Sequence, residues 1–97
     1  MIRHFVLLKW NQTLSEEQLT TFNAAYAALP EQINTIRNIA HGPDKQFYPG
    51  NYDYVLMLDF DNKADLDEYV ASPAHAELLE KIVGPFLEGW AIAQIEI

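Results

Sequence analysis

This 97-residue sequence has no cysteine, which excludes disulfide bonds, thiolate metal sites and cysteine nucleophiles. Its apolar runs are short, and none approaches the length of about 18 residues that a membrane-spanning helix needs. We therefore expect a soluble protein with no membrane partner. Basic residues are also few, with six Lys and Arg against fourteen Asp and Glu and a formal net charge of −8. Such a surface would repel a phosphate backbone, so nucleic acid is not an expected partner.

Several functional motifs are also missing. There is no glycine-rich phosphate loop and no activated-serine motif, and the three histidines lack the spacing of a metal site. The acidic run Asp59–Glu68 is not a calcium loop, because Lys63 stands at a ligand position and no glycine occupies the sixth position. We expect no metal and no cofactor. The first residues lack the pattern of a secretory signal peptide, so we expect a cytoplasmic address.

Two segments alternate as β-strands do. In Ile2–Trp10 the predicted inner face comprises Ile2, His4, Val6, Leu8 and Trp10. The second strand is Tyr52–Phe60, with Tyr52, Tyr54, Leu56, Leu58 and Phe60 on one face. The opposite faces are still apolar at their centres, where they carry Phe5, Leu7, Val55 and Met57. The pattern also predicts strands at Ile33–His41 and Trp90–Ile97 and a loop at Gly42–Asn51, which would leave His41 solvated.

Helix signals lie between these strands. Ser15 and Gln18 form a capping box, and Leu14 can pack on Leu19. The apolar stripe that follows predicts a helix ending before Pro30, with Leu19, Phe22, Tyr26 and Leu29 inward. A second helix starts at Asp61 or Asn62, turns Leu66, Tyr69 and Val70 inward, and restarts at Ser72–Pro73. The restarted helix has a stripe of His75, Leu79, Ile82 and Phe86 and closes at Gly84, Pro85 and Gly89.

The element order is β-α-β-β-α-β, in one domain spanning residues 1–97. This order predicts an α+β, ferredoxin-like protomer, with a four-stranded antiparallel sheet and helices on one face. The other face would leave Phe5, Leu7, Val55 and Met57 exposed, and a patch of this kind marks an interface. We therefore expect a homodimer that joins sheet to sheet about a twofold axis.

The segments Ile2–Trp10, Tyr52–Phe60 and Tyr69–Leu79 make the chain resemble the stress-responsive A/B barrel family of dimeric α/β-barrel proteins. The resemblance covers nearly the whole chain, and its most specific parts are His4 and the Pro-Ala-His of residues 73–75 with Tyr69 upstream. It implies a dimer whose two sheets form a barrel, but no single activity. One branch includes olivetolic acid cyclase, a polyketide cyclase that carries out an intramolecular aldol condensation without a cofactor.

The resemblance to that cyclase implies site residues. His4 looks like its first-strand histidine, Tyr69 like its catalytic tyrosine and His75 like its base, while Phe22 and Tyr26 look like its pocket aromatics. We expect an apolar pocket that also includes Val6, Leu8, Leu79, Phe86 and Gln94. The chain departs from the family in its last strand, where the usual histidine-bonding Asp is replaced by Ala93 or Gln94 and Glu96 is the nearest acid. It also has Ser72 where the family commonly has His.

Three functions remain open at this point. The first is a cofactor-independent enzyme of cyclase or lyase type, acting on an apolar carbonyl compound with His75 as base and Tyr69 as polar partner. The second is a non-catalytic dimer that binds an apolar ligand or serves a stress role, in which His75 only completes the pocket wall and His4 is a satisfied strand residue. A haem or oxygen-dependent monooxygenase ranks last, since no axial ligand is found.

Overall fold

The computed structural model describes residues 1–97. Its regular elements are β1 (Ile2–Trp10), α1 (Glu16–Gln32), β2 (Asn38–Pro43), β3 (Tyr54–Phe60), α2 (Lys63–Ala71), α3 (Pro73–Glu77) and β4 (Leu87–Glu96). A π-helical turn, η1 (Leu78–Val83), and a 3₁₀ turn, η2 (Gly84–Phe86), join α3 to β4. No helix is both long and apolar enough to cross a membrane.

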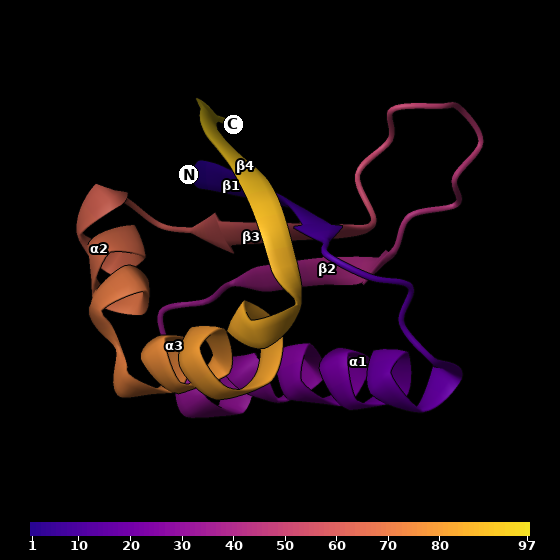
Figure 1. Ribbon diagram of the computed structural model, residues 1–97. Helices are drawn as coiled ribbons and strands as arrows, with labels where there is room; N and C mark the ends of the chain where they lie inside the picture. Colours follow the sequence, from indigo (N-terminus) through magenta and orange to yellow (C-terminus); the bar gives the residue numbers. More distant parts are fainter.

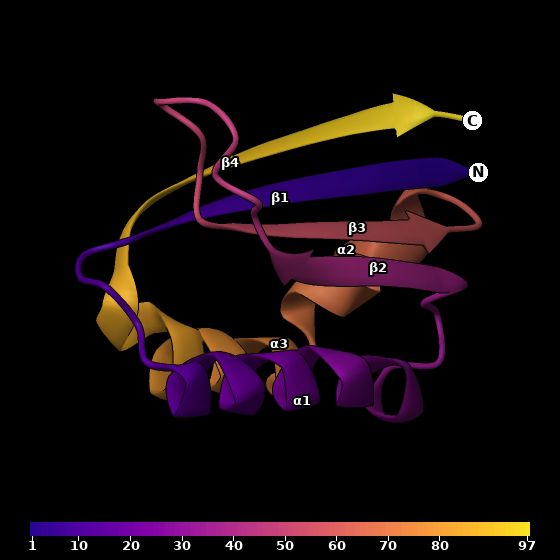
Figure 2. The same cartoon turned by 90° about the vertical axis from the view of Figure 1, so that its right-hand side faces the viewer.

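The strands form one antiparallel sheet in the order β2-β3-β1-β4, with β2 and β4 at the edges. The helices lie on one side of this sheet, and the connection between β2 and β3 rises on the side away from α1 (Figures 1 and 2). This is the ferredoxin-like arrangement that the element order predicted, with β1 and β3 at the centre as their apolar faces require.

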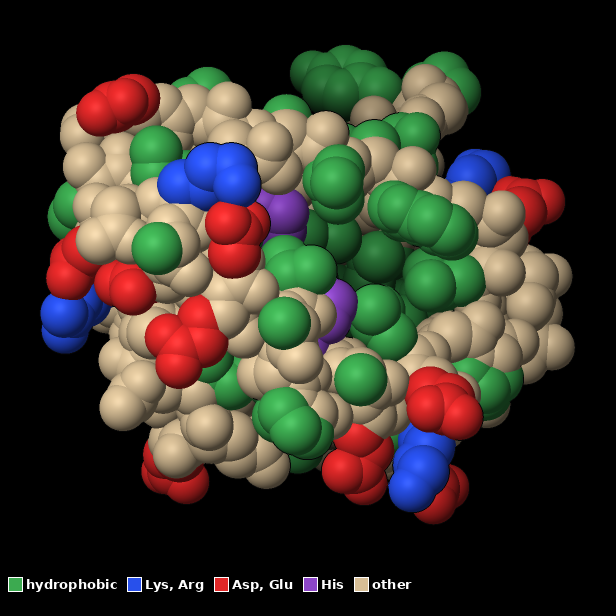
Figure 3. Space-filling view, turned by 90° about the vertical axis from the view of Figure 1, so that its left-hand side faces the viewer, with side chains coloured by type: hydrophobic (Ala, Val, Ile, Leu, Met, Phe, Trp, Pro, Cys, Tyr) green, Lys and Arg blue, Asp and Glu red, His purple; other side chains and the backbone are tan.

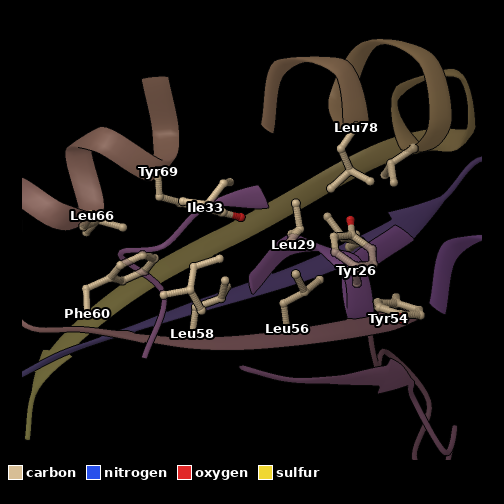
Figure 4. Packing of buried hydrophobic residues seen from close by; sticks show 13 residues of the cluster. Tyr26, Leu29, Ile33, Tyr54, Leu56, Leu58, Phe60, Leu66, Tyr69 and Leu78 are labelled. Atoms are coloured by element: carbon tan, nitrogen blue, oxygen red, sulfur yellow. The ribbon is translucent and has the colours of Figure 1, made fainter. Parts of the chain in front are cut away.

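The core lies between β3 and the helices. Tyr54, Leu56, Leu58 and Phe60 alternate along β3 and are at most 1% exposed. Figure 4 shows them pointing toward Tyr26, Leu29 and Ile33 of the α1 segment, Leu66 and Tyr69 of α2, and Leu78. Each fully buried large apolar side chain stabilises the fold by about 1.5–3 kcal/mol. The alternation predicted from sequence is confirmed.

Helix α1 begins as predicted and ends later. The Ser15 hydroxyl accepts a hydrogen bond from the Gln18 N–H at 3.1 Å, and the Gln18 side chain accepts one from the Ser15 N–H at 2.8 Å. The helix does not stop before Pro30 but runs on to Gln32. Proline removes only one backbone donor, and the Ile33 N–H still bonds the Leu29 carbonyl at 2.8 Å. The predicted end was therefore three residues too early.

Strand β2 corrects the prediction for His41. The strand spans Asn38–Pro43, later than the predicted Ile33–His41, and pairs Gly42 with Val55 and Pro43 with Tyr54 of β3. Proline is tolerated there because β2 is an edge strand. His41 is thus a half-buried strand residue and not a solvated loop histidine. Its Nδ1 lies 2.9 Å from the Tyr54 hydroxyl.

The second helical region breaks where predicted. Asn62 caps α2, and the Ser72 hydroxyl accepts the His75 N–H at 3.2 Å to start α3 behind Pro73. The π-helical turn was not predicted. In it the Gly84 N–H bonds the Leu79 carbonyl, and a Cβ on Gly84 would lie 2.0 Å from that oxygen. Glycine is therefore required for this close approach.

Two further boundaries differ from the prediction. Gly89 does not close the helix, because β4 already begins at Leu87 and pairs Gly89 with Lys9. Strand β3 begins at Tyr54, two residues later than predicted.

The sheet face away from the helices is apolar at its centre. One row across the strands reads Ala40, Met57, Phe5 and Ala93, and the next reads Gly42, Val55, Leu7 and Ala91. Bulky side chains therefore occupy the two central strands, while the edge strands carry only Ala and Gly. No helix of the chain packs over this face (Figure 1). We refer to these eight residues as the open sheet face.

Candidate functional site

A cavity of about 360 Å³ lies on the helix side of the sheet, between β1 and β4 on one side and α2 and α3 on the other. Figure 3 shows a hollow surrounded by hydrophobic side chains, with histidine atoms at its edge. We call it the histidine cavity. Its lining residues are His4, Val6, Leu8, Val70, His75, Leu79, Leu87, Trp90 and Ile92. Apart from the two histidines, every lining side chain is apolar.

The alternation of side chains along the strands positions the residues on the sheet side of this cavity. His4, Val6 and Leu8 share the helix-facing side of β1 because side chains two residues apart point the same way. The register of β4 sets Ile92 opposite Val6 and Trp90 opposite Leu8, so both extend the same wall. Since β4 is an edge strand, Trp90 and Ile92 stay 64% and 59% exposed at the mouth.

His4 lies in the wall of the cavity and is only 6% exposed. Its Nδ1 lies 3.0 Å from the side-chain nitrogen of Gln94, which faces it directly across the β1–β4 pair. Burial lowers the pKa of His4 below its usual value near 6.5, and the nearby His75 lowers this pKa further. His4 is therefore neutral near pH 7.

His75 lies at the start of α3 and faces the cavity from the other side. Burial lowers the pKa of His75 too, although a hydrogen bond to the backbone of Val70 opposes this shift. In its neutral form the ring of His75 has one N–H donor and one nitrogen with a lone pair.

Tyr69 connects the two histidines without lining the cavity. Its ring meets the His75 ring edge-on at a centroid distance of 4.7 Å and the His4 ring at 6.2 Å. The residue is 2% exposed, and burial raises the pKa of its hydroxyl to about 12. The structure thus brings His4, Tyr69 and His75 together, as the family resemblance implied, but places Tyr69 behind the cavity wall.

The predicted pocket residues divide into two groups. Val6, Leu8 and Leu79 line the histidine cavity. Phe22, Tyr26 and Phe86 do not, because they pack in an aromatic cluster with Trp10 and Tyr54. In that cluster Phe22 lies 5.2 Å from Trp10 and 5.7 Å from Phe86, and Tyr26 lies 5.4 Å from Tyr54, between ring centroids. Gln94 does not line the cavity either, although it bonds His4.

Four lining residues were missed from sequence: Val70, Leu87, Trp90 and Ile92. The alternation of Trp90 and Ile92 in the last strand was a usable signal, since it places both on the face of Gln94. Val70 was predicted to point inward, and it lies half-exposed at the cavity mouth. Leu87 follows the unpredicted turns η1 and η2, so no simple periodicity reaches it.

In the last strand, neither Gln94 nor Glu96 takes the place of the family's histidine-bonding Asp beside His75. Gln94 bonds His4 and not His75, while Glu96 lies opposite Ile2 and is exposed. Neither cavity histidine has a carboxylate partner among the side-chain hydrogen bonds. No group of three or more His, Asp or Glu side chains is arranged to hold a metal ion.

Residues 2–97 match the family described as Stress responsive A/B Barrel Domain. The chain belongs to this family. A comparison of the A/B barrel domain with curated proteins finds no match. Among solved structures it is similar to a dimeric ferredoxin-like protein of unknown function from Thermobifida fusca YX, with 31% identity over 99% of this chain and 90% of that chain and a TM-score of 0.87.

Two further solved structures share the fold of the A/B barrel domain. A dimeric protein of unknown function from Bacteroides fragilis NCTC 9343 is 30% identical over 99% of this chain and 95% of that chain, with a TM-score of 0.82. A hydroxynitrile lyase from Passiflora edulis is 20% identical over 99% of this chain and 92% of that chain, with a TM-score of 0.83. At that last identity the likeness shows the fold alone.

Proposed function

We propose that this A/B barrel domain binds an apolar carbonyl compound in the histidine cavity and acts on it by acid–base chemistry without a cofactor. The observation that carries the proposal is the pair of neutral histidines, His4 and His75, in a cavity whose other lining is apolar. A neutral imidazole has the lone pair needed to remove a proton. The volume of about 360 Å³ suits a small ligand, since ligand sites span about 300–1,000 Å³.

The groups present support a reaction that begins with proton removal beside a carbonyl. His75 removes a proton from the carbon beside the carbonyl, and the electron pair of the broken C–H bond moves toward the carbonyl oxygen to give an enolate. In a cyclase step the enolate carbon forms a C–C bond with a second carbonyl, and the proton on His75 returns to the alkoxide that results. A lyase step is the reverse. Neither consumes an oxidant or a reductant, and acid–base catalysis of this kind contributes about 10²–10⁴ in rate.

Hydrogen–deuterium exchange tests the first step without knowledge of the natural substrate. The protein is incubated in D₂O with a medium-chain methyl ketone, and exchange beside the carbonyl is followed by NMR. We expect catalysed exchange with the native chain and its loss in His75→Gln. The matched control is His41→Gln, since His41 is also half-buried but lies outside the cavity. Equal exchange in the native chain and His75→Gln rules out His75 as the base.

A ligand-binding function without catalysis is the second candidate. The lack of a carboxylate beside either histidine favours it, because nothing here raises the basicity of the imidazoles. Trp90 at the cavity mouth reports on binding through its fluorescence. Ketone binding that changes this fluorescence, with no exchange above the buffer rate, supports the binding function. A drop of several degrees in Tm for His75→Ala, with no activity to lose, supports it as well.

The functional unit is a homodimer built through the open sheet face. The Thermobifida and Bacteroides relatives are described as dimeric. On this face the bulky side chains of the two central strands β1 and β3 lie between edge-strand positions that carry only Ala and Gly, which leaves room for the same residues of a second copy. A twofold axis can bury such a self-complementary face. Sedimentation measures the mass: twice 11.1 kDa is expected, and a stable 11.1 kDa species in dilute solution contradicts the dimer.

A further inference from the structure

The two histidines of the cavity are not equivalent, and Gln94 makes the difference. Antiparallel pairing of β1 and β4 sets Gln94 directly opposite His4, and its Nε2 lies 3.0 Å from His4 Nδ1. An amide NH₂ group has no lone pair to offer and can only donate. Nδ1 of His4 is therefore the acceptor, and the single proton of the neutral ring sits on Nε2.

The Nε2 group of His4 opens into the cavity. It has no partner among the side-chain hydrogen bonds of the protein, where only Nδ1 is bonded. No buried polar side-chain atom lacks a partner, so Nε2 reaches accessible space. His4 is only 6% exposed and lines the histidine cavity, so the accessible space that its Nε2 reaches is the cavity.

His75 has no such partner. Only its backbone N–H takes part in a side-chain hydrogen bond, so nothing of this kind fixes its tautomer, and its neutral ring can present a lone pair to the cavity that it lines. One wall of the cavity thus offers an N–H donor and the other a lone pair. Tyr69, the alternative donor, does not line the cavity.

We propose that Gln94 is a positioning residue that holds His4 as the Nε2–H tautomer, so that His4 donates a hydrogen bond to the carbonyl oxygen of a neutral ligand while His75 takes the proton. The role in catalysis rests on the proposed function, whereas the tautomer does not. A neutral donor suits an uncharged ketone or ester. A carboxylate is disfavoured, because no cationic side chain lines the cavity and the chain has a net charge of −8.

Nitrogen-15 NMR of the histidine rings tests the tautomer directly at a pH where His4 is neutral. In the native chain we expect the proton of His4 on Nε2. In Gln94→Glu the carboxylate can only accept, so we expect the proton to move to Nδ1, and in Gln94→Leu we expect a mixture. The control is His41, whose ring signals should not change in either variant. A native His4 protonated on Nδ1, or a tautomer unchanged in Gln94→Glu, overturns the proposal.

The donor role has its own measurement. A methyl ketone labelled with carbon-13 at the carbonyl is added, and its carbonyl shift reports a hydrogen bond to the oxygen. We expect the native chain to move this shift in the direction of a stronger hydrogen bond, and Gln94→Glu and His4→Phe to lose the change. A bound ketone whose carbonyl shift is the same in all three proteins contradicts the donor role. If the tautomer and the carbonyl shift are as expected but no deuterium exchange is observed, only the catalytic function is contradicted.

Discussion

Tyr69 presents its ring edge-on to the ring of His75, with the two planes at 63° and their centroids 4.7 Å apart. The same ring packs against Phe60 of β3 at 5.3 Å. Tyr69 therefore holds α2 to the sheet and supports the histidine from behind the cavity wall. Its position explains why a residue that touches both histidines need not touch the ligand.

Two substitutions of Tyr69 distinguish the contribution of its ring to stability from that of its hydroxyl. We expect Tyr69→Phe to change the free energy of unfolding by less than about 1 kcal/mol, because the ring contacts remain. Tyr69→Ala removes them and should cost about 3–5 kcal/mol. Urea denaturation of both variants measures the difference. A similar large loss in Tyr69→Phe contradicts the view that the ring is the structural element.

The stability of the fold should fall as the pH drops from about 7 to 5. Burial lowers the pKa values of His4 and His75 in the folded state, so the unfolded chain binds protons first. The stabilisation is complete above the unfolded pKa near 6.5 and is lost as the pH falls toward the folded values. Urea denaturation at several pH values in this range measures the free energy of unfolding, which should depend less on pH in the double variant His4→Gln/His75→Gln. Part of the slope remains, since burial also lowers the pKa of His41.

Gly84 should be the glycine least tolerant of substitution. A Cβ there would lie 2.0 Å from the Leu79 carbonyl oxygen, which is backbone and cannot rotate away. We expect Gly84→Ala to cost about 1–3 kcal/mol. The matched variant is Gly89→Ala, where nothing lies within 4 Å of the added Cβ. Thermal unfolding compares the two, and equal Tm values would mean that the π-helical turn adjusts freely.

The ion pair of Arg3 and Asp59 should stabilise the fold more than the exposed ion pairs do. Asp59 is 1% exposed and is bonded twice by the Arg3 guanidinium, at 2.8 and 2.9 Å, which holds the pKa of its carboxyl low. We expect Arg3→Met to lower the Tm clearly, because it leaves the buried Asp59 carboxylate without its charged partner. In the exposed pair of Arg37 and Asp61, Arg37→Met should change the Tm little. Similar losses in both variants would contradict the ranking.

A charge on the open sheet face should break the dimer. Met57 stands between Ala40 and Phe5 at the centre of that face, so Met57→Glu would bury a carboxylate without a partner. We expect its sedimentation mass to fall to that of one 11.1 kDa chain. Ala27→Glu makes the same charge change at an exposed position of α1 and should leave the dimer intact. A dimeric Met57→Glu protein would place the interface elsewhere.

The elements with strong local signals could be predicted from the sequence. The alternation of β1 and β3, the capping box at Ser15 and the restart at Ser72–Pro73 all depend on residues within one turn or one strand of each other. The errors have two sources. Pairing with the distant strand β3 draws Gly42 and Pro43 into β2. The π-helical turn is local, with Gly84 bonded to the carbonyl of Leu79 five residues earlier, but the apolar periodicity does not distinguish such a turn from a regular helix.

The site shows the same division. The identities of His4, Tyr69 and His75, their family resemblance and the inward face of β1 were all readable from the sequence by itself, because each depends on residue type and local periodicity. Which nitrogen of His4 carries the proton was decided only by the tertiary structure. That choice depends on Gln94, ninety residues away along the chain, and it is set by the register in which β4 pairs with β1.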